Sequence, residues 1–353
     1  MHKNAKIYIA GHNGLVGSAI HRHLVALGYE NIICRSHSEL DLMNQDATNK
    51  FFEDEKPEYV FLAAAKVGGI NANNIYRADF ILDNLQIQNN VISASYKNKV
   101  KKLLFLGSVC IYPKNATFPI VEDSLLTGEL EYTNEPYAIA KIAGIKLIES
   151  FNLQYGTNYV AVMPTNLYGE NDNFDLEKSH VMPALIRKCL LCKNLEDGNL
   201  EYIANNLGLK DKSKTSILSE LTKYGIEKNG DIVSLGVWGT GKAYREFMHV
   251  DDMADACIFV MDNVDFSDLS KNDKEVRNTQ INIGTGEDIT IKDLVYKIKE
   301  VTGFNGEIKF DTSKPDGTYR RPLDVSKLSA LGWTSKIDLD SGLAKTIEWY
   351  ESK

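Results

Sequence analysis

The sequence has few cysteines, no long apolar run and no excess of positive charge. Its five cysteines among 353 residues form an odd and scattered set, which argues against a disulfide framework. No stretch approaches 18 consecutive apolar residues, so we expect no helix that spans a membrane. The net charge of -8 argues against a general nucleic-acid binder, and an anionic ligand must be held by local cations.

The first residues of the chain show no targeting signal. Residues 6–10 already form a strand-like stretch, and no charged-then-apolar leader or cleavage site precedes them. We therefore expect a protein of the reducing cytoplasm. The hydrophobic fraction of 43% and the charged fraction of 25% are ordinary for a globular chain, and the length suits two modest domains or one large α/β unit.

Short apolar stretches recur along the first half of the chain, with helical patterns between them. The predicted strands are residues 6–10, 31–34, 59–63, 102–106 and 159–163. The predicted helices are residues 15–27, 81–96 and 137–155. Because the strands are apolar throughout and alternate with helices, they indicate a parallel sheet covered on both faces. We predict the doubly wound (Rossmann) α/β fold.

The pattern changes after about residue 170 to loops and short elements, with later helices near 292–301 and 341–351. We expect residues 1–170 to form a dinucleotide-binding domain, to which later segments near 232–262 return. Residues 171–353 should form mainly a smaller, discontinuous substrate-binding domain. Within it, residues 193–230 are polar, rich in Asn and Lys, and weakly amphipathic, which predicts an inserted surface helical hairpin; a role in substrate binding or assembly is the alternative.

A glycine-rich turn follows the first predicted strand and opens the first predicted helix. Glycines in this place let the backbone approach a pyrophosphate, and the helix N-terminus supplies N–H donors and a positive dipole. The spacing is G-x-x-G-x-x-G, and its strand–turn–helix context makes it a dinucleotide site rather than a plain tight turn. The predicted cofactor-binding residues of this turn are Gly11, Asn13, Gly14, Leu15, Val16 and Gly17.

The end of the second strand indicates which dinucleotide binds. NAD sites usually have an acidic residue there, whereas Arg35 stands in this place and favours the 2′-phosphate of NADPH. Asp41 and Leu42 lie further along and could reach the adenine. Three small residues end the third strand, as is needed where backbone lies against a cofactor: Ala63, Ala64 and Ala65.

A tyrosine and a lysine four residues apart, Tyr137 and Lys141, lie on one face of a predicted helix. A nearby ammonium lowers the pKa of a phenol, so the tyrosine can exchange a proton near neutral pH. Ser108 ends the fourth strand and can hydrogen-bond the same carbonyl oxygen. The three residues together suit hydride transfer at a carbonyl.

The chain resembles the extended short-chain dehydrogenase/reductases, and among them the GDP-L-fucose synthase family of epimerase-reductases. The resemblance covers nearly the whole chain except residues 193–230. The blocks that carry it are residues 11–17, 63–70, 107–113, 135–141, 164–169, 179–187, 238–241, 245–252 and 313–318. The family usually has arginine where Asn13 stands, so one expected contact with the 2′-phosphate is lost and the NADPH preference rests mainly on Arg35.

The resemblance implies an NADPH-dependent 4-reductase of a GDP-4-keto-6-deoxy sugar in nucleotide-sugar biosynthesis for surface glycans, with C3/C5 epimerisation by Cys110 and His180. Cys110 lies two residues beyond Ser108, and an extended backbone would point both side chains the same way. The resemblance also implies a homodimer formed through helices that flank the sheet. It adds cofactor contacts at Pro164, Asn166, Leu167 and His180, besides Tyr137 and Lys141. It assigns the substrate to Ser108, Asn166, Val181, Arg187, Trp238, Arg245 and Lys314.

Other interpretations stay open at the level of sequence. The same fold could serve as a nucleotide-sugar 4-epimerase with recycled NAD, or as a non-catalytic module that senses a dinucleotide. The sugar could be a mannose derivative or a heptose analogue, and reduction could proceed without epimerisation. Cys189 and Cys192 have the spacing of a zinc-binding pair, but no second pair and no histidine at ligand spacing accompany them, so we expect no metal.

Overall fold

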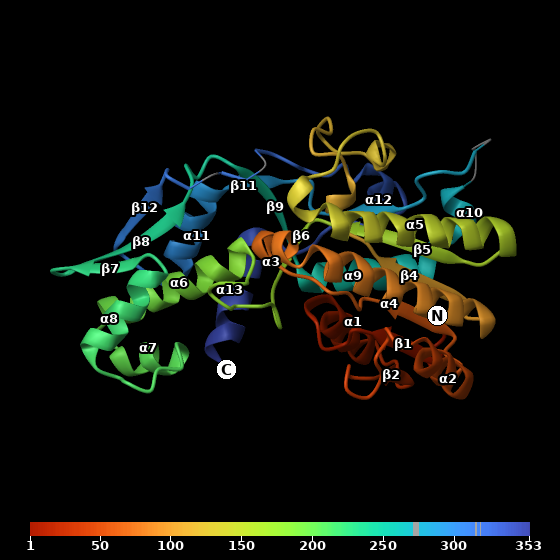
Figure 1. Ribbon diagram of the computed structural model, residues 1–353, viewed down its shortest axis with the longest axis horizontal. Coiled ribbons are helices and arrows are strands. Elements are labelled where there is room, and N and C mark those ends of the chain that lie inside the picture. Colours follow the sequence, from red (N-terminus) through yellow and green to blue (C-terminus); the bar gives the residue numbers. More distant parts are fainter. Residues whose placement is uncertain (271–274, 315, 318) are drawn as a thin grey trace. The chain divides into compact units, whose positions relative to one another are not determined.

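The structure is a computed structural model of the chain, and it describes residues 1–270, 275–314, 316–317 and 319–353 (Figure 1). Pro315 and Thr318 of the sequence block 313–318 therefore lie outside the described residues. Contacts divide the chain into two compact units. The first unit comprises Met1–Asp172, Glu246–Glu287 and Pro322–Asp338, and the second comprises Asn173–Arg245, Asp288–Arg321 and Leu339–Lys353.

A parallel sheet forms the centre of the first unit, with the strand order β10-β5-β4-β3-β1-β2. Its strands are β1 (Ile7–Ala10), β2 (Ile32–Cys34), β3 (Tyr59–Leu62), β4 (Lys102–Leu106), β5 (Tyr159–Pro164) and β10 (Ile281–Ile283). Every residue of β1 and β4 is buried, because helices cover both faces of the sheet. The doubly wound fold and the five strands expected from the sequence are confirmed, and β10 adds a sixth strand beside β5.

The helices of the first unit connect and cover these strands. They are α1 (Leu15–Ala26), α2 (Gln45–Glu55), α3 (Ile70–Ile75), α4 (Arg77–Lys97), α5 (Glu135–Tyr155), α9 (Val250–Asn263), α10 (Phe266–Leu269) and α12 (Ser326–Ala330). Short 3-10 helices lie at η1 (Val109–Ile111), η2 (Glu122–Ser124) and η3 (Tyr132–Asn134). None of the helices in the described ranges combines the length and the apolar character that crossing a bilayer requires.

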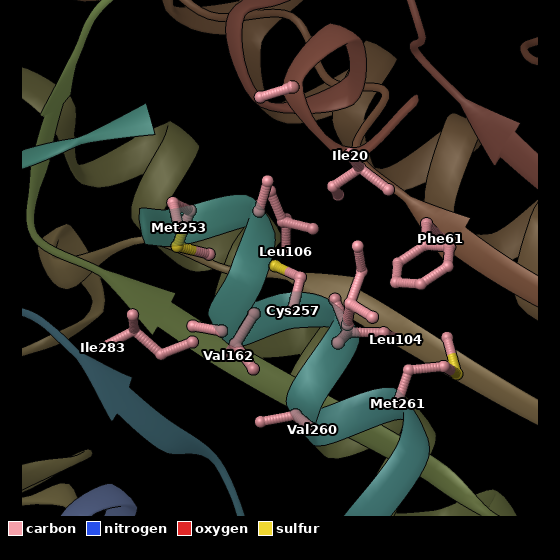
Figure 2. Close-up of a cluster of buried hydrophobic side chains, with 14 of the residues drawn as sticks. Ile20, Phe61, Leu104, Leu106, Val162, Met253, Cys257, Val260, Met261 and Ile283 are labelled. Carbon is pink, nitrogen blue, oxygen red and sulfur yellow. The ribbon is translucent and has the colours of Figure 1, made fainter. Parts of the chain in front are cut away.

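The core of the first unit consists of two clusters, one on each face of the sheet, because successive strand residues point to opposite faces. Leu104 and Leu106 of β4 belong to one cluster, whereas Leu103 and Phe105 belong to the other. Figure 2 shows the first cluster, in which side chains of α9 such as Cys257 lie beside those of β4 and β5. This packing holds the strands in place, and the candidate site residues come directly after the carboxyl ends of these strands.

The second unit contains a small mixed sheet with the strand order β12-β8-β7, whose members lie side by side in Figure 1. Its strands are β7 (Ile226–Asn229), β8 (Ile232–Trp238) and β12 (Glu307–Asp311), and β11 (Asp288–Thr290) also belongs to this unit. The helices are α6 (Val181–Glu196), α7 (Leu200–Asn206), α8 (Lys214–Lys223), α11 (Ile291–Thr302) and α13 (Leu339–Glu351).

The chain returns to the first unit at Glu246 rather than at the expected residue 232. The reason is that β8 pairs with β12 in parallel and with β7 in antiparallel, so it is part of the second unit. The return also extends further than residue 262, because β10 joins the large sheet. In the first unit, Phe247–His249, the last residues of β9 (Tyr244–His249), pair with β6 (Asn166–Tyr168).

The segment 193–230 contains the end of α6, both helices α7 and α8, and the strand β7. Side-chain caps start the two short helices: Asn199 accepts a hydrogen bond from the backbone of Tyr202, and Ser213 accepts one from Ser216. Ile203 of α7 and Leu221 of α8 are fully buried. The pair of helices predicted from the sequence is therefore present, and each helix buries an apolar side chain.

Candidate active site

The turn between β1 and α1 requires glycine at two positions. Gly11 has a φ of +88°, and a Cβ on it would lie 2.7 Å from the backbone nitrogen of Ala64. A Cβ on Gly17 would lie 2.1 Å from the carbonyl oxygen of Gly11. The turn therefore packs directly on its own first residue and on the backbone that follows β3, and neither contact tolerates a side chain.

The N-terminus of α1 is open to an anionic group. Gly14 is the N-cap residue and no side chain caps the helix, while Leu15 and Val16 of the first turn are half-buried and Asn13 is exposed. The first-turn N–H groups and the helix dipole therefore point to the turn without a competing side-chain acceptor. This cradle fits the pyrophosphate of a dinucleotide.

Arg35 follows β2, as the sequence predicts, and it already has partners within the first unit. Its guanidinium pairs with the carboxylate of Glu55 at 2.6 Å, donates to the carbonyl of Cys34 at 2.8 Å and lies 5.6 Å from the ring centre of Phe51. The side chain keeps 35% of its surface exposed. A 2′-phosphate would therefore meet a guanidinium that Glu55 already orients and partly neutralises.

Other predicted cofactor residues lie at the ends of strands of the same sheet. Ala63, Ala64 and Ala65 follow β3 and are half-buried. The Asp41 carboxylate accepts the backbone N–H of Met43 at 2.9 Å, and Leu42 beside it is buried. Pro164 ends β5.

Asn166 and Leu167 lie in β6, directly after this strand end. The Asn166 amide donates to the carbonyl oxygen of Glu246 at 2.9 Å. The carboxylate of Glu246 is 1% exposed and accepts backbone N–H groups of Thr285, Gly286 and Leu323 at 2.7–3.0 Å. Sequence reasoning missed Glu246, although a carboxylate directly before the apolar pair Phe247 and Met248 is a signal for a buried hydrogen-bonding role.

Ser108 and Cys110 lie together at the end of β4, but for a different reason from the one expected. The backbone after Ser108 is not extended: Val109–Ile111 forms the 3-10 turn η1, and Ser108 is its N-cap residue. The Ser108 hydroxyl accepts the backbone N–H of Cys110 at 3.4 Å and its thiol at 2.9 Å. The turn brings the thiol to the hydroxyl, because an N-cap side chain faces the groups that follow it.

Tyr137 and Lys141 lie one turn apart on α5, beside the end of β4. The Lys141 ammonium is 5.8 Å from the ring centre of Tyr137 and 4.7 Å from that of Phe105. It donates to the carbonyl of Leu106 at 2.8 Å and is 3% exposed. Tyr137 also interacts with Ser108, whose hydrogen bond favours the charged form of the phenol. The structure thus brings the serine, the tyrosine and the lysine together.

The electrostatics of this group differ from the sequence-based expectation. Burial, and then the closeness of the titratable thiol of Cys110, raise the pKa of Tyr137, and the hydrogen bond with Ser108 opposes them only in part. Burial also lowers the pKa of Lys141 to about 8. The expected lowering of the phenol pKa by the ammonium is therefore overridden, because loss of water disfavours the charged form of both groups.

The second unit holds most of the residues predicted to contact the substrate. Trp238 ends β8 and is 71% exposed, and the Lys314 ammonium lies 5.5 Å from its ring centre. Burial and then the positive charge of Arg321 lower the pKa of Arg245, so two guanidinium groups lie near one another. Arg321 is a further cation that sequence reasoning did not single out. The loop beside Trp238 is fixed by Asp316, which accepts from the backbone and hydroxyl of Thr240 at 2.8 and 2.6 Å.

The remaining predicted residues lie at the start of α6. His180 is its exposed N-cap residue and Val181 is half-buried. The Arg187 guanidinium donates three hydrogen bonds within the second unit, two to Asn206 and one to the carbonyl of Phe174. Lys188, which sequence reasoning missed, is half-buried, and no hydrogen bond or ion pair joins its ammonium to another described residue. Burial lowers its pKa.

The described residues contain no group of three or more His, Cys, Asp or Glu side chains placed to hold a metal ion. Cys189 and Cys192 are buried in α6. Burial raises the pKa of both thiols, that of Cys189 to about 12, which disfavours the thiolate that zinc requires.

Comparisons with known proteins agree with this architecture. A sequence profile of the NAD dependent epimerase/dehydratase family matches residues 7–284. GDP-L-fucose synthase 1 of Arabidopsis thaliana is 49% identical over 348 residues, which covers 99% of this chain and 94% of the relative.

Two solved structures also cover the whole chain. A GDP-6-OMe-4-keto-L-xylo-heptose reductase from C. jejuni is 48% identical, with a TM-score of 0.94 and coverage of 100% of this chain and 99% of that one. A GDP-D-glycero-L-gluco-heptose synthase from Campylobacter jejuni, solved in the presence of NADPH, is 46% identical, with a TM-score of 0.89 and the same coverage of 100% and 99%.

Proposed function

The chain belongs to the NAD dependent epimerase/dehydratase family, and from this premise we propose that it is an NADPH-dependent 4-reductase of a GDP-4-keto-6-deoxy sugar. We further propose that it epimerises C3 and C5 of that sugar. The observation that carries the proposal is the grouping of Ser108, Tyr137 and Lys141 beside the end of β4. The relatives are named for GDP-L-fucose and for GDP-linked heptoses, and these names support the choice of substrate class.

The reductive step needs an acid at the carbonyl oxygen. Bound NADPH supplies the hydride. The Tyr137 hydroxyl gives its proton to the carbonyl oxygen at C4, and Ser108 donates a hydrogen bond that orients the same oxygen. The raised pKa of Tyr137 keeps it protonated before the step, and the ammonium of Lys141 stabilises the phenolate that forms.

The residues that would hold the dinucleotide are those of the turn from Gly11 to Gly17, with Arg35 at the 2′-phosphate. The glycine contacts and the uncapped N-terminus of α1 fit this group. For the GDP part we assign Trp238, Arg245 and Lys314, since an exposed indole suits a guanine base and the cations of Arg245 and Lys314 suit a diphosphate. Lys188 is a further candidate for the diphosphate.

The epimerisation step uses an acid and a base at carbon. A 4-keto group acidifies the hydrogens at C3 and C5, and we assign Cys110 and His180 to the transfer of these protons. Cys110 donates to Ser108, so the thiol lies next to the hydroxyl that orients the carbonyl oxygen. His180 is the N-cap residue of α6, and burial lowers the pKa of its imidazole, which favours the neutral form that can act as a base.

The decisive experiment follows deuterium from the solvent into the product. The protein is incubated in D2O with NADPH and GDP-4-keto-6-deoxy-mannose, and in parallel with the corresponding heptose, and the product is analysed by NMR. We expect NADPH oxidation and deuterium at C3 and C5. Reduction without label would leave a 4-reductase alone. Interconversion at C4 without net consumption of NADPH would indicate a 4-epimerase with recycled NAD, and no turnover would overturn the proposal.

Cys110→Ser separates the two activities. Serine is a far weaker acid than a thiol, so we expect loss of deuterium incorporation, while reduction of a ketosugar that already has the product configuration at C3 and C5 stays within a factor of about 3. If that reduction also stops, Cys110 has a role beyond epimerisation.

The finer biological setting is part of the same proposal. A GDP-linked deoxysugar would be used for surface glycans such as a capsule, and the enzyme would work in the cytoplasm as a homodimer. Support for a dimer comes from α4 and α5, which pack against each other and carry the exposed apolar side chains Leu82 and Leu153.

A further inference from the structure

One buried face of α4 carries two polar side chains in line with an aromatic one. Phe80, Asn84 and Gln88 are four residues apart, so they lie along one side of the helix, and each is at most 3% exposed. A buried amide costs free energy unless it is hydrogen-bonded, so the partners of these side chains show which parts of the chain the helix holds.

Asn84 holds the chain directly after the alanines that follow β3. Its Oδ1 accepts the backbone N–H of Lys66 at 3.0 Å, and its Nδ2 donates to the Lys66 carbonyl at 3.0 Å. The same nitrogen donates to the Phe80 carbonyl of its own helix at 2.7 Å. The side chain thus binds both backbone groups of Lys66, as a neighbouring strand would. All of these bonds need the amide, so all are lost when the side chain is removed.

The loop of residues 66–69 is held a second time at its other end. Asn73 of α3 donates its amide to the carbonyls of Gly68 and Gly69 at 2.7 and 3.2 Å. The Phe80 ring packs on the same place, because a Cβ on Gly68 would lie 3.1 Å from its Cζ. The glycine therefore lets the ring approach the backbone of the loop closely.

The Phe80 ring also contacts the proposed general acid. Its centre lies 6.4 Å from that of the Tyr137 ring, and the two planes meet at 81°, which is an edge-to-face arrangement. Phe80 is therefore in contact with the loop of residues 66–69 and with Tyr137 at once. A fixed loop gives the ring one position, and the ring in turn limits the positions open to the phenol.

Gln88, the third residue of this face, binds α5 itself. Its Nε2 donates to the carbonyl of Ala140 at 2.7 Å, one residue before Lys141. A Cβ on Gly144 would lie 2.9 Å from its Oε1, so α4 and α5 pack closely at this turn. The packing of α5 on α4 is thus held by contacts of its own, and it remains when Asn84 is changed.

We propose that Asn84 is a positioning residue for the reductive step, and that it acts on Tyr137 through Phe80. It holds residues 66–69 against Phe80, and this ring keeps the Tyr137 hydroxyl where it meets the carbonyl oxygen at C4. The inference rests on the proposed function, because it requires Tyr137 to give the proton. Without the amide, the loop and the ring gain freedom, and the phenol spends less of its time in the productive orientation.

Asn152 of α5 offers a matched control for Asn84. Its side chain is also buried, and it makes the same pair of bonds with the backbone of Tyr159, at 2.7 and 2.9 Å. Tyr159 is the first residue of β5, whereas the site residues come after the carboxyl ends of the strands. Asn152→Ala therefore removes a similar hold on the backbone at the end of the strand that is remote from the site.

The test follows a single turnover of NADPH with a ketosugar that already has the product configuration at C3 and C5. We expect Asn84→Ala and Asn152→Ala both to unfold at a lower urea concentration than the wild type. Only Asn84→Ala should slow reduction, by a factor of about 10 to 100, while Asn152→Ala stays within about threefold of the wild type. Equal losses of rate in the two variants would overturn the inference. So would NADPH binding more than about tenfold weaker in Asn84→Ala, which would assign the residue to the cofactor.

Phe80→Leu tests the route through the ring. Leucine is too short to contact both the loop and Tyr137, and the Asn84 bond to the Phe80 backbone is kept, so we expect slower reduction from this change alone. Because both residues act on the same phenol, adding Asn84→Ala to Phe80→Leu should lower the rate by less than about threefold more. Losses that multiply in the double variant would overturn the inference. Phe80→Leu also gives the result if Asn84→Ala does not fold.

Amide hydrogen exchange adds a measurement that needs no turnover. The N–H of Lys66, which Asn84 binds, should exchange faster in Asn84→Ala and at the wild-type rate in Asn152→Ala. If the wild type does not reduce the ketosugar, the proposed function fails and this inference fails with it. If the wild type reduces it and Asn84→Ala does so at the same rate, only the role of Asn84 is wrong.

Discussion

Lys141 is 3% exposed, and its ammonium has the carbonyl of Leu106 as acceptor. A single backbone acceptor replaces water only in part, so burial lowers the pKa of the lysine to about 8. A group with this pKa is charged at neutral pH and loses its charge just above it. The stabilisation that it gives to a phenolate on Tyr137 is therefore sensitive to pH in the alkaline range.

We expect kcat for NADPH-dependent reduction to fall as the pH rises through about 8, because Lys141 loses its proton there. A stopped-flow or absorbance profile between pH 6 and 10 measures this. Folding stability should change in the opposite direction. The unfolded chain keeps the lysine proton up to a pH near the ordinary pKa of 10.5, so the stability that this group contributes increases between about pH 8 and pH 10.5. Unfolding therefore cannot explain the fall in kcat. Lys141→Met should be slow and should lack the inflection; a wild-type rate that is flat across this range contradicts the prediction.

Tyr137→Phe removes the hydroxyl that gives the proton to the carbonyl oxygen. The ring stays, and with it the edge contact with Phe80 at 6.4 Å, so the fold should be kept. We expect kcat to fall by a factor of about 100 or more, in line with the loss of general acid catalysis. Titration of NADPH fluorescence should give a dissociation constant close to that of the wild type. A variant that reduces the ketosugar at the normal rate would assign the proton to another group.

Among the elements, the β1–α1 turn is the part of the site most tightly constrained by its own backbone. Gly17→Ala places a Cβ 2.1 Å from the carbonyl oxygen of Gly11, so the helix must move away from the turn. We expect a loss of about 1–3 kcal/mol in the free energy of unfolding, as for overpacking elsewhere, and weaker NADPH binding.

Gly14→Ala is the matched control for this prediction. Its Cβ would lie 3.5 Å from the same oxygen, an ordinary contact, and the φ of Gly14 is -80°. Urea denaturation should therefore give Gly14→Ala a stability within about 1 kcal/mol of the wild type. Equal losses for the two variants would show that the close contact at Gly17 is not what limits the turn.

The elements of the first unit could be predicted from the sequence because each strand is apolar throughout and the segments between strands carry apolar residues at helical spacing. The 3-10 turn η1 could not, since Val109–Ile111 is as apolar as a strand. Its course depends on the Ser108 hydroxyl accepting from Cys110, which is a cap visible only in three dimensions. The partner of Arg187 could not be predicted either: its block matches the family, but Asn206 lies in an insertion that the family pattern does not cover.

For the whole molecule, the exposed apolar side chains of α4 and α5 predict self-association. Leu82 of α4 and Ile139, Leu153 and Tyr155 of α5 are 40–64% exposed, and several exposed apolar side chains on two packed helices are typical of a protein–protein contact. Sedimentation should give a mass of about twice 39.5 kDa, and Leu82→Lys with Leu153→Lys should shift it toward the single-chain mass. Val25→Lys on α1, a side chain that is 53% exposed, is the control and should leave the mass unchanged. A wild-type mass of one chain contradicts the expectation.

The first unit is assembled from three stretches of chain, and this has a consequence for its synthesis. The sheet lacks its edge strand β10 until residues beyond 283 have left the ribosome, and the last stretch of the unit ends at Asp338. At ordinary rates of translation, the segment from Asp172 to Ile283 takes roughly 6–22 s to make. During that time β5 exposes an unpaired edge. A nascent chain stalled before residue 281 should therefore be a better chaperone substrate than the finished protein, although it already contains the whole glycine turn and the Tyr137–Lys141 pair.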